Sequence, residues 1–306
     1  MLPDEPRPST DRAPEAEPPG CYRHPRTTTG ISCTRCERPI CPQCMVAASV
    51  GFQCPECVGE GHAGARRATT RFGGAPSLVA GLVTRVLVGI NLVVWVLAAY
   101  VLVPRLGEVW ALVSAGRAHA GGPYGVADGP GQWYRLLTAT FLHLQWWHIG
   151  LNMLVLLWLG PPLEEALGRL RFVALYLLAG LGGSTFTFLV AGDWVNSFGA
   201  SGAVFGLIGA TILMQLRDRG PLAPAVAFLV FNLVVTFSGA RGGPGGVGPS
   251  IDWRAHIGGL VIGVLVSFGL MYAPRERRGV VQALTLVGAL ALEAGLLLAG
   301  MALYGA

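Results

Sequence analysis

Two short polar stretches interrupt the apolar runs of this chain, each at the point where a run begins. One is Gly199-Ala200-Ser201-Gly202, and the other is Ala255-His256-Ile257-Gly258-Gly259. Polar and ionisable side chains are costly inside a bilayer and mark functional positions there. A serine hydroxyl activated by a histidine is a nucleophile for acyl transfer. The two stretches therefore predict that Ser201 and His256 act as nucleophile and general base on a peptide bond, within or beside a membrane.

Ser201 would begin a helix, where unpaired backbone N–H groups and the helix dipole favour developing negative charge. That is the charge that a tetrahedral oxyanion carries after a serine attacks a carbonyl. His148 and Asn152 are four residues apart, so they share one helix face and can both donate a hydrogen bond to the same oxygen. We expect these two side chains to belong to the same site.

Small residues follow both polar groups at the spacing that lets two helix backbones approach closely. They are Gly202, Gly206, Gly259 and Gly263. Phe205 lies one turn after Ser201 and can stack on the ring of His256. Packing thus favours a direct pairing of the two segments.

Each of these residues alone has a plainer interpretation. A serine at a helix start is commonly a cap, a histidine at a helix end commonly packs, and small-residue spacing occurs in any bundle. The Gly-x-Ser-x-Gly elbow of other serine hydrolases does not fit, because Ala203 stands where the second glycine belongs. Asp193 and Asp252 are loop acids that could complete a triad, but we expect a two-residue dyad.

The elements that must position these residues are membrane helices. Apolar residues make up 52% of the 306-residue chain and charged residues only 13%, against roughly 25% in soluble domains. The apolar excess falls in runs after residue 77 that are long enough to span a bilayer. We predict an all-α polytopic bundle of seven spans, at Leu78–Val103, Trp146–Gly160, Phe172–Val190, Ser201–Leu216, Leu222–Ser238, His256–Tyr272 and Val280–Leu303.

Arginine placement predicts the orientation of the spans, since the chain has no lysine. With the N-terminus inside, the inner loops are short and densely basic, as cytoplasmic loops are. Spans two, four and six then all run from the outside inward. This direction places four polar residues at a similar depth in the outer leaflet: His148, Asn152, Ser201 and His256.

All seven cysteines lie in the segment from Cys21 to Cys57. His24 follows Cys21 after two intervening residues, the same spacing that separates the cysteines of each pair. Four pairs with two intervening residues each offer eight ligands, enough for two tetrahedral zinc sites. The pairs are Cys21/His24, Cys33/Cys36, Cys41/Cys44 and Cys54/Cys57. Because such a segment has almost no hydrophobic core, bound metal would supply its folding energy.

Interleaved pairing would place the first and third pairs on one ion and the other two pairs on the second. That arrangement resembles cross-braced fingers of the B-box type, and sequential pairing is the alternative. Both sites would be closed, which favours a structural or partner-binding role over catalysis. The sequence does not identify the partner, and too few arginines accompany the module for nucleic-acid binding.

Five motifs between residues 78 and 303 resemble those of rhomboid intramembrane serine proteases. They are Trp133-Tyr134-Arg135, His148-x-x-x-Asn152, Leu163-Glu164-x-x-x-Gly168, Gly199-x-Ser201-Gly202 and Ala255-His256-x-Gly258-Gly259. The resemblance implies Ser201 as nucleophile and His256 as base. It also implies an oxyanion hole made of His148, Asn152 and the backbone N–H of Ser201.

The resemblance further implies that Arg135 anchors a first outer loop, that Glu164 stabilises span two, and that His143 lies in a watery cavity. Phe205 stands where some relatives have tyrosine, which keeps the ring and loses a hydroxyl. The seventh span matches the longer variant of the family. The glycine-rich run 242–248 fits the loop that covers the active site in relatives.

We therefore expect four parts: a disordered tail (1–20), a B-box-like zinc domain (21–62), a basic linker (63–77) and a rhomboid protease domain (78–303). The chain would be an integral protein of a bacterial plasma membrane, with a cytoplasmic zinc domain, and would cleave transmembrane proteins. A catalytically silent rhomboid-like protein that binds membrane clients is the alternative, and the intact serine and histidine argue against it. A transporter is a third possibility, but it would need paired membrane charges or repeated broken helices, and the sequence has neither pattern.

Overall fold

The computed structural model describes residues 17–64, 68–101, 112–113, 132–143, 145–190, 195–239 and 251–304. The chain divides into two compact units, Met1–Arg67 and Ala68–Ala306. Several parts of the sequence predictions lie outside the described residues: most of the N-terminal tail, residues 65–67 of the basic linker, Asp193 and the glycine-rich run 242–248.

The smaller unit contains little regular structure. Its elements are an antiparallel pair of strands followed by a helix: β1 (Val46–Ala47), β2 (Phe52–Gln53) and α1 (Pro55–Gly64). The buried apolar side chains among its described residues are Ile40 and six of the seven cysteines. A core this small cannot hold a fold by apolar burial alone.

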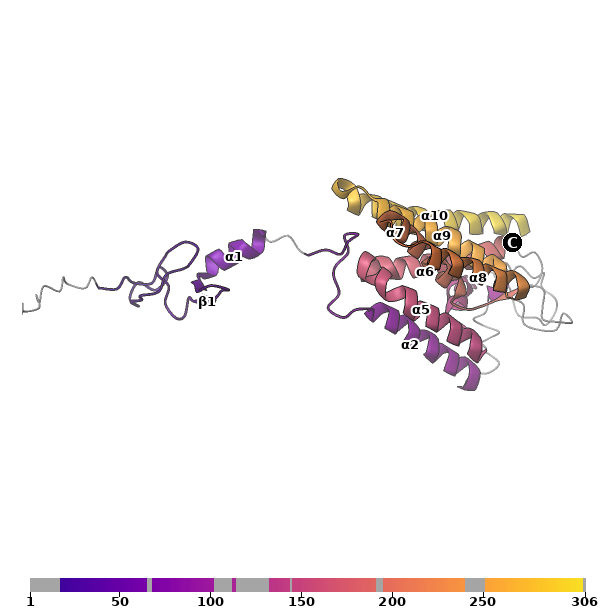
Figure 1. The fold of residues 1–306 in the computed structure, drawn as a ribbon, viewed down its shortest axis with the longest axis horizontal. Helices are drawn as coiled ribbons and strands as arrows, with labels where there is room; N and C mark the ends of the chain where they lie inside the picture. Colours follow the sequence, from indigo (N-terminus) through magenta and orange to yellow (C-terminus); the bar gives the residue numbers. More distant parts are fainter. Residues whose placement is uncertain are drawn as a thin grey trace, which may run out of the picture. The chain divides into compact units, whose positions relative to one another are not determined.

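The larger unit is a bundle of long helices (Figure 1). Its elements are α2 (Leu82–Val96) with the π-helical turn η1 (Leu97–Val101), β3 (Leu112–Val113), α4 (Arg135–Thr138), η3 (Ala139–Phe141), α5 (Trp146–Leu167), α6 (Arg169–Val190), β4 (Asn196–Ser197), α7 (Ser201–Asp218), α8 (Ala223–Gly239), α9 (Trp253–Tyr272), η4 (Arg275–Arg277) and α10 (Arg278–Tyr304). Among the described residues, four segments are long and apolar enough to cross a membrane: α2 with η1, α6, α9, and η4 with α10. The predicted α-helical membrane fold is confirmed.

A helix lies at each of the seven predicted spans, but several helices are longer than predicted. α5 continues through Pro161 and Pro162 to Leu167 instead of ending at Gly160. Neighbouring helices let a membrane helix tolerate proline, because they help to satisfy the freed backbone groups. The added residues are packed as well, since Leu163, Glu164 and Leu167 are all buried.

The helix that carries His256, α9, packs between α6 and α7. Where α7 meets α9 the two backbones touch, because glycines face each other along a seam. A Cβ atom on Gly259 would overlap the carbonyl oxygen of Gly202, and one on Gly263 would overlap the backbone of Gly206. The seam therefore fixes the separation of the two helices that carry the candidate nucleophile and base.

Adding one methyl group at Gly259 is expected to weaken this seam. In Gly259→Ala the new Cβ atom would force α7 and α9 apart, at a cost of about 1–3 kcal/mol. Gly288→Ala in α10 is the matched control, because a Cβ atom there would meet nothing within 4 Å. Thermal unfolding in detergent should show a lower midpoint for Gly259→Ala only. Equal midpoints for the two variants would contradict the seam.

The carboxylate of Glu164 joins α5 to the start of α2. Its Oε1 accepts a hydrogen bond from the backbone N–H of Val83 at 3.0 Å. Its Oε2 accepts from the backbone N–H and from the hydroxyl of Thr84, both at 3.0 Å. Negative charge is stabilised at a helix N-terminus, where N–H groups lack partners within the helix. Glu164 is only 1% exposed, so this buried carboxylate caps α2 from a neighbouring helix.

Residues 68–77, which we expected to be part of the linker, pack on the bundle. Phe72 is 1% exposed and belongs to the hydrophobic core of the larger unit. Its backbone N–H donates to the carbonyl of Ala166 at 3.1 Å, and its carbonyl accepts from Gln282 Nε2 at 2.9 Å. The packed unit therefore begins before Leu78. A single aromatic residue decides this, and the composition of the segment gave no indication of it.

Candidate active site and metal centres

Ser201 and His256 face each other across the seam between α7 and α9. The distance from His256 Nε2 to Ser201 Oγ is 2.8 Å, which is a hydrogen bond. Ser201 is the first residue of α7, and His256 is buried in the first turns of α9. The fold thus brings together a serine and a histidine that are 55 positions apart in the sequence.

Phe205 lies against one face of the histidine ring. The two ring centroids are 4.2 Å apart, and the ring planes differ by 14°. Phe205 is placed there because it follows Ser201 by one helical turn and so shares its face. A stacked ring restricts rotation of the imidazole and keeps Nε2 directed at the serine hydroxyl.

A tight turn places Ser201 at the start of its helix. β4 pairs antiparallel with β3, and α7 begins four residues after β4 ends. Gly199 lies in this turn with φ of 124°, and its N–H donates to the carbonyl of Ala139 at 2.8 Å. A Cβ atom at Gly199 would lie 2.7 Å from the ring of His148. Both the backbone conformation and the close contact require glycine.

A cavity of about 150 Å³ joins these residues to the predicted oxyanion donors. Its lining includes His148, Asn152, Ser201 and His256, together with Gly199 from the turn. The cavity also has apolar walls, from α5, α7 and α8. The four polar residues predicted to lie at one depth therefore share one cavity.

His143 connects this cavity to the turn before Ser201. Its Nε2 accepts a hydrogen bond from the backbone N–H of Ala200 at 3.2 Å and lies 3.3 Å from Asn152 Nδ2. The same Nδ2 donates to the carbonyl of His148 at 3.1 Å. The family resemblance implied that His143 lies in the cavity, but the side chain is fully buried and is not among the residues that line it. Its contacts show that it holds the amide of Asn152 and the start of α7 in register.

The carboxylate of Asp252 is engaged away from the base. One oxygen caps α9 by accepting from the N–H of Arg254 at 3.1 Å, and the other accepts from the hydroxyl of Thr187 at 2.6 Å. The second ring nitrogen of His256, Nδ1, instead lies 2.7 Å from Oγ1 of Thr236 in α8. We did not predict Thr236 from the sequence. The available signal was its spacing of four from Asn232 in an otherwise apolar span.

Arg135, predicted to anchor the outer loop, is 4% exposed in the short helix α4. The next residue, Leu136, packs in one cluster with Phe188 of α6 and Leu297 of α10. Apolar contacts therefore hold α4 against the bundle.

Known proteins are similar to the larger unit of this chain in sequence. Residues 130–273 match the profile of the Rhomboid domain. One relative is YdcA of Bacillus subtilis (strain 168), a protein assigned by name to the rhomboid proteases. It is 32% identical to this chain over 160 residues, which cover 50% of this chain and 74% of YdcA. The chain belongs to the rhomboid family.

Other rhomboid relatives are much longer than the part they share with this chain. Rhomboid-type serine protease 2 of Emericella nidulans is 31% identical over 180 residues, covering 57% of this chain and 35% of that protein. Rhomboid protease GluP of Bacillus subtilis is 34% identical over 140 residues, covering 46% and 26%. The chain thus spans well under half the length of these two relatives. The chain is thus an integral membrane protein whose relatives include proteins named as rhomboid serine proteases.

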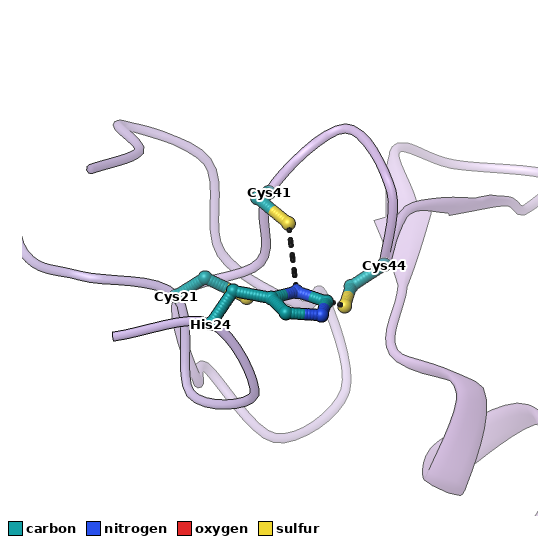
Figure 2. Close-up of side chains that lie close together, drawn as sticks. All are labelled: Cys21, His24, Cys41 and Cys44. Carbon is teal, nitrogen blue, oxygen red and sulfur yellow. Dashed lines mark hydrogen bonds between the residues drawn. The ribbon is translucent and has the colours of Figure 1, made fainter. Parts of the chain in front are cut away.

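The smaller unit of this rhomboid protein gathers its eight predicted ligands into two groups. Within each group the ligand atoms all lie within 4.8 Å of one another. The groups interleave along the chain: Cys21, His24, Cys41 and Cys44 form one, and Cys33, Cys36, Cys54 and Cys57 form the other. Figure 2 shows the His24 ring of the first group directed at the sulfur atoms of Cys41 and Cys44.

The distances within both groups fit a tetrahedral ion. His24 Nδ1 lies 3.4 Å from the sulfur atoms of Cys41 and Cys44, and the sulfur atoms of Cys36 and Cys54 are 3.7 Å apart. Zinc bonds of about 2.3 Å to sulfur and about 2.0 Å to nitrogen would separate tetrahedral ligands by about 3.5–3.8 Å. A disulfide would need sulfur atoms about 2.05 Å apart. Both donor sets can therefore hold a metal ion.

Polar neighbours favour thiolates in part of the second group. Burial raises the pKa of the Cys33 thiol, but backbone N–H groups outweigh it and lower the pKa to about 6. Arg38 lowers the pKa of Cys36, because its Nε lies 3.2 Å from that sulfur. Hydrogen bonding with the Cys54 side chain and burial raise the pKa of Cys57 to about 12, so without a cation this thiol keeps its proton. A bound cation would remove that difference, because metal ligands must be deprotonated.

Proposed function

We propose that this chain is an intramembrane serine endopeptidase in which Ser201 is the nucleophile and His256 is the general base. One observation carries the proposal: the 2.8 Å contact between Ser201 Oγ and His256 Nε2. Both side chains line a cavity whose other lining residues are partly polar and partly apolar. A neutral imidazole that accepts the hydroxyl proton makes the serine oxygen nucleophilic.

The reaction then follows two acyl-transfer steps. Ser201 Oγ forms a bond to the scissile carbonyl carbon as its proton moves to Nε2 of His256. The tetrahedral intermediate collapses when the C–N bond breaks, and the same proton moves to the leaving amine. Water then attacks the acyl-enzyme with His256 again as base, which releases the new carboxylate and restores the serine.

The oxyanion of each intermediate would be stabilised by the side chains of His148 and Asn152 and by the backbone N–H of Ser201. The start of α7 supports this role, because helix N-termini present free N–H groups to an anion. One amide hydrogen of Asn152 is donated to the carbonyl of His148. The other has only a 3.3 Å contact with His143 Nε2, which already accepts from the Ala200 N–H, so this hydrogen is the one we expect to turn toward the oxyanion.

Transmembrane proteins are the proposed substrates, in keeping with the class on which rhomboid proteases act. The cavity presents apolar side chains of α5 and α8, including Leu151, Val155 and Val235, beside the polar dyad. A substrate helix must unwind to react, because helical hydrogen bonding hides its carbonyl groups. We expect a small residue before the scissile bond and helix-breaking residues nearby.

For the smaller unit we propose two structural zinc ions and a partner-binding role. Each donor set provides four ligands, which leaves no open position for a catalytic water. The short arginine-rich loops support a cytoplasmic location for this unit. The zinc ions take no part in the proposed peptide-bond chemistry.

Labelling with a fluorophosphonate probe tests the proposed activity, because only an activated serine reacts. We expect the purified protein to be labelled, Ser201→Ala to lose the label, and Ser267→Ala to keep it. Ser267 is a matched control because it is buried in α9, about three turns beyond His256. A folded protein that binds membrane clients but takes no label would support the catalytically silent alternative.

A further inference from the structure

We propose that Thr236 is a positioning residue that fixes the tautomer of His256, so that Nε2 is free to accept the Ser201 proton. This inference rests on the proposed serine protease function and deepens it. It adds a third member to what we predicted from the sequence as a dyad.

The hydroxyl of Thr236 makes two short contacts. Its Oγ1 lies 2.7 Å from the carbonyl oxygen of Asn232, one turn earlier in α8, and 2.7 Å from Nδ1 of His256. Thr236 is 2% exposed, so these two protein groups are the close partners of its hydroxyl. Both partners must therefore be satisfied by one hydroxyl, which has a single proton.

The partners decide where that proton lies. The carbonyl of Asn232 can only accept, so the Thr236 hydroxyl donates to it. Toward His256 the same oxygen can then only accept, which requires a proton on Nδ1. A neutral imidazole has one ring N–H, so Nε2 is left as an acceptor. That nitrogen lies 2.8 Å from Ser201 Oγ, where a general base must be.

The opposite tautomer would be unfavourable here. Nδ1 would then need the hydroxyl proton, and the Thr236 oxygen would face the Asn232 carbonyl oxygen at 2.7 Å with no hydrogen between them. Nε2 would carry a proton and could not accept one from Ser201. The helical backbone of α8 thus selects the reactive tautomer through one side chain.

Thr236 holds the position that a carboxylate occupies in three-residue serine proteases. Asp252, an acidic residue that lines the cavity, is engaged with Thr187 and with the start of α9. A neutral hydroxyl orients the imidazole without adding a buried charge at membrane depth, where charge is costly. When His256 becomes protonated during the reaction, its hydrogen bond to Thr236 becomes charge-assisted and strengthens.

Steady-state cleavage of a transmembrane substrate by the full-length protein tests this role. Thr236→Val keeps the shape and removes the hydroxyl, and we expect kcat to fall about tenfold with KM unchanged, the effect of losing one hydrogen bond. Thr236→Ser restores the hydroxyl and should recover kcat to within about twofold. Thr211→Val is the matched control, since Thr211 is a buried threonine of α7 that donates to the carbonyl four residues earlier.

Nitrogen NMR of labelled histidine provides a readout that packing alone would not change. We expect the wild-type His256 to carry its proton on Nδ1, and Thr236→Val to populate both tautomers. A wild-type proton on Nε2, an unchanged kcat in Thr236→Val, or equal losses in the valine and serine variants would overturn the inference. If cleavage does not depend on Ser201 at all, the proposed protease function fails instead.

Discussion

Ser201→Ala is expected to lose cleavage of a single-span substrate almost completely, with kcat falling about 10⁴- to 10⁶-fold. The variant has no hydroxyl to attack the carbonyl, and only the oxyanion donors and substrate binding remain. His256→Ala should fall by a similar factor, because an unactivated serine hydroxyl is a poor nucleophile. The measurement is substrate cleavage by purified protein in proteoliposomes, with the fragments identified by mass spectrometry.

The double variant distinguishes a catalytic pair from two independent contributors. Residues that act as a unit are strongly non-additive, so Ser201→Ala with His256→Ala should be no slower than either single variant. The 2.8 Å contact between the two side chains predicts this result. Losses that multiply in the double variant would mean that the two residues act separately. Unchanged circular dichroism in each variant would show that the bundle remains folded.

Removing metal is expected to unfold the smaller unit while the helix bundle stays intact. The described core of that unit consists of cysteines and Ile40, so little apolar burial remains without an ion. Structural zinc supplies about 10–16 kcal/mol in small zinc domains. Treatment with a strong chelator should therefore expose residues 21–62 to proteases and to fast amide exchange. Peptides from α6, α7 and α9 should remain protected.

Elemental analysis tests the two donor sets separately. The intact protein should contain two zinc ions per chain, one for each group of four ligands. Cys44→Ser and Cys54→Ser lie in different groups, so each should lower the content to about one ion. Glu60→Gln, an exposed change in α1, should leave the content unchanged. A content near zero in the intact protein would reject the zinc module.

Sequence reasoning found the candidate site residues that stand out chemically from their surroundings. A serine and a histidine at the starts of apolar runs are anomalous in a membrane, so their types and spacing indicated a shared site. The cysteine pairs were equally distinctive. The spacing did not predict how those pairs are grouped, because it allowed both the interleaved and the sequential arrangement. The fold brings alternate pairs together.

Other parts of the site depend on contacts that have no local pattern. Thr236 resembles any helical threonine that bonds to the carbonyl four residues earlier, as Thr211 does. Its contact with His256 is decided by how α8 packs against α9. Phe72 is one aromatic residue in a segment rich in glycine, alanine and arginine, and its burial depends on the ends of distant helices. Such features require tertiary structure.

Gln282 connects α10 to the rest of the helix bundle by hydrogen bonds. Its amide nitrogen donates to the carbonyls of Phe72 and Leu270, and its amide oxygen accepts from Arg171. The Rhomboid domain match ends at residue 273, before this side chain. A protein truncated at that boundary would lose the three hydrogen bonds that tie α6, α9 and the segment before α2 together. Part of what holds the helices of this bundle together therefore lies beyond the residues that match the Rhomboid domain.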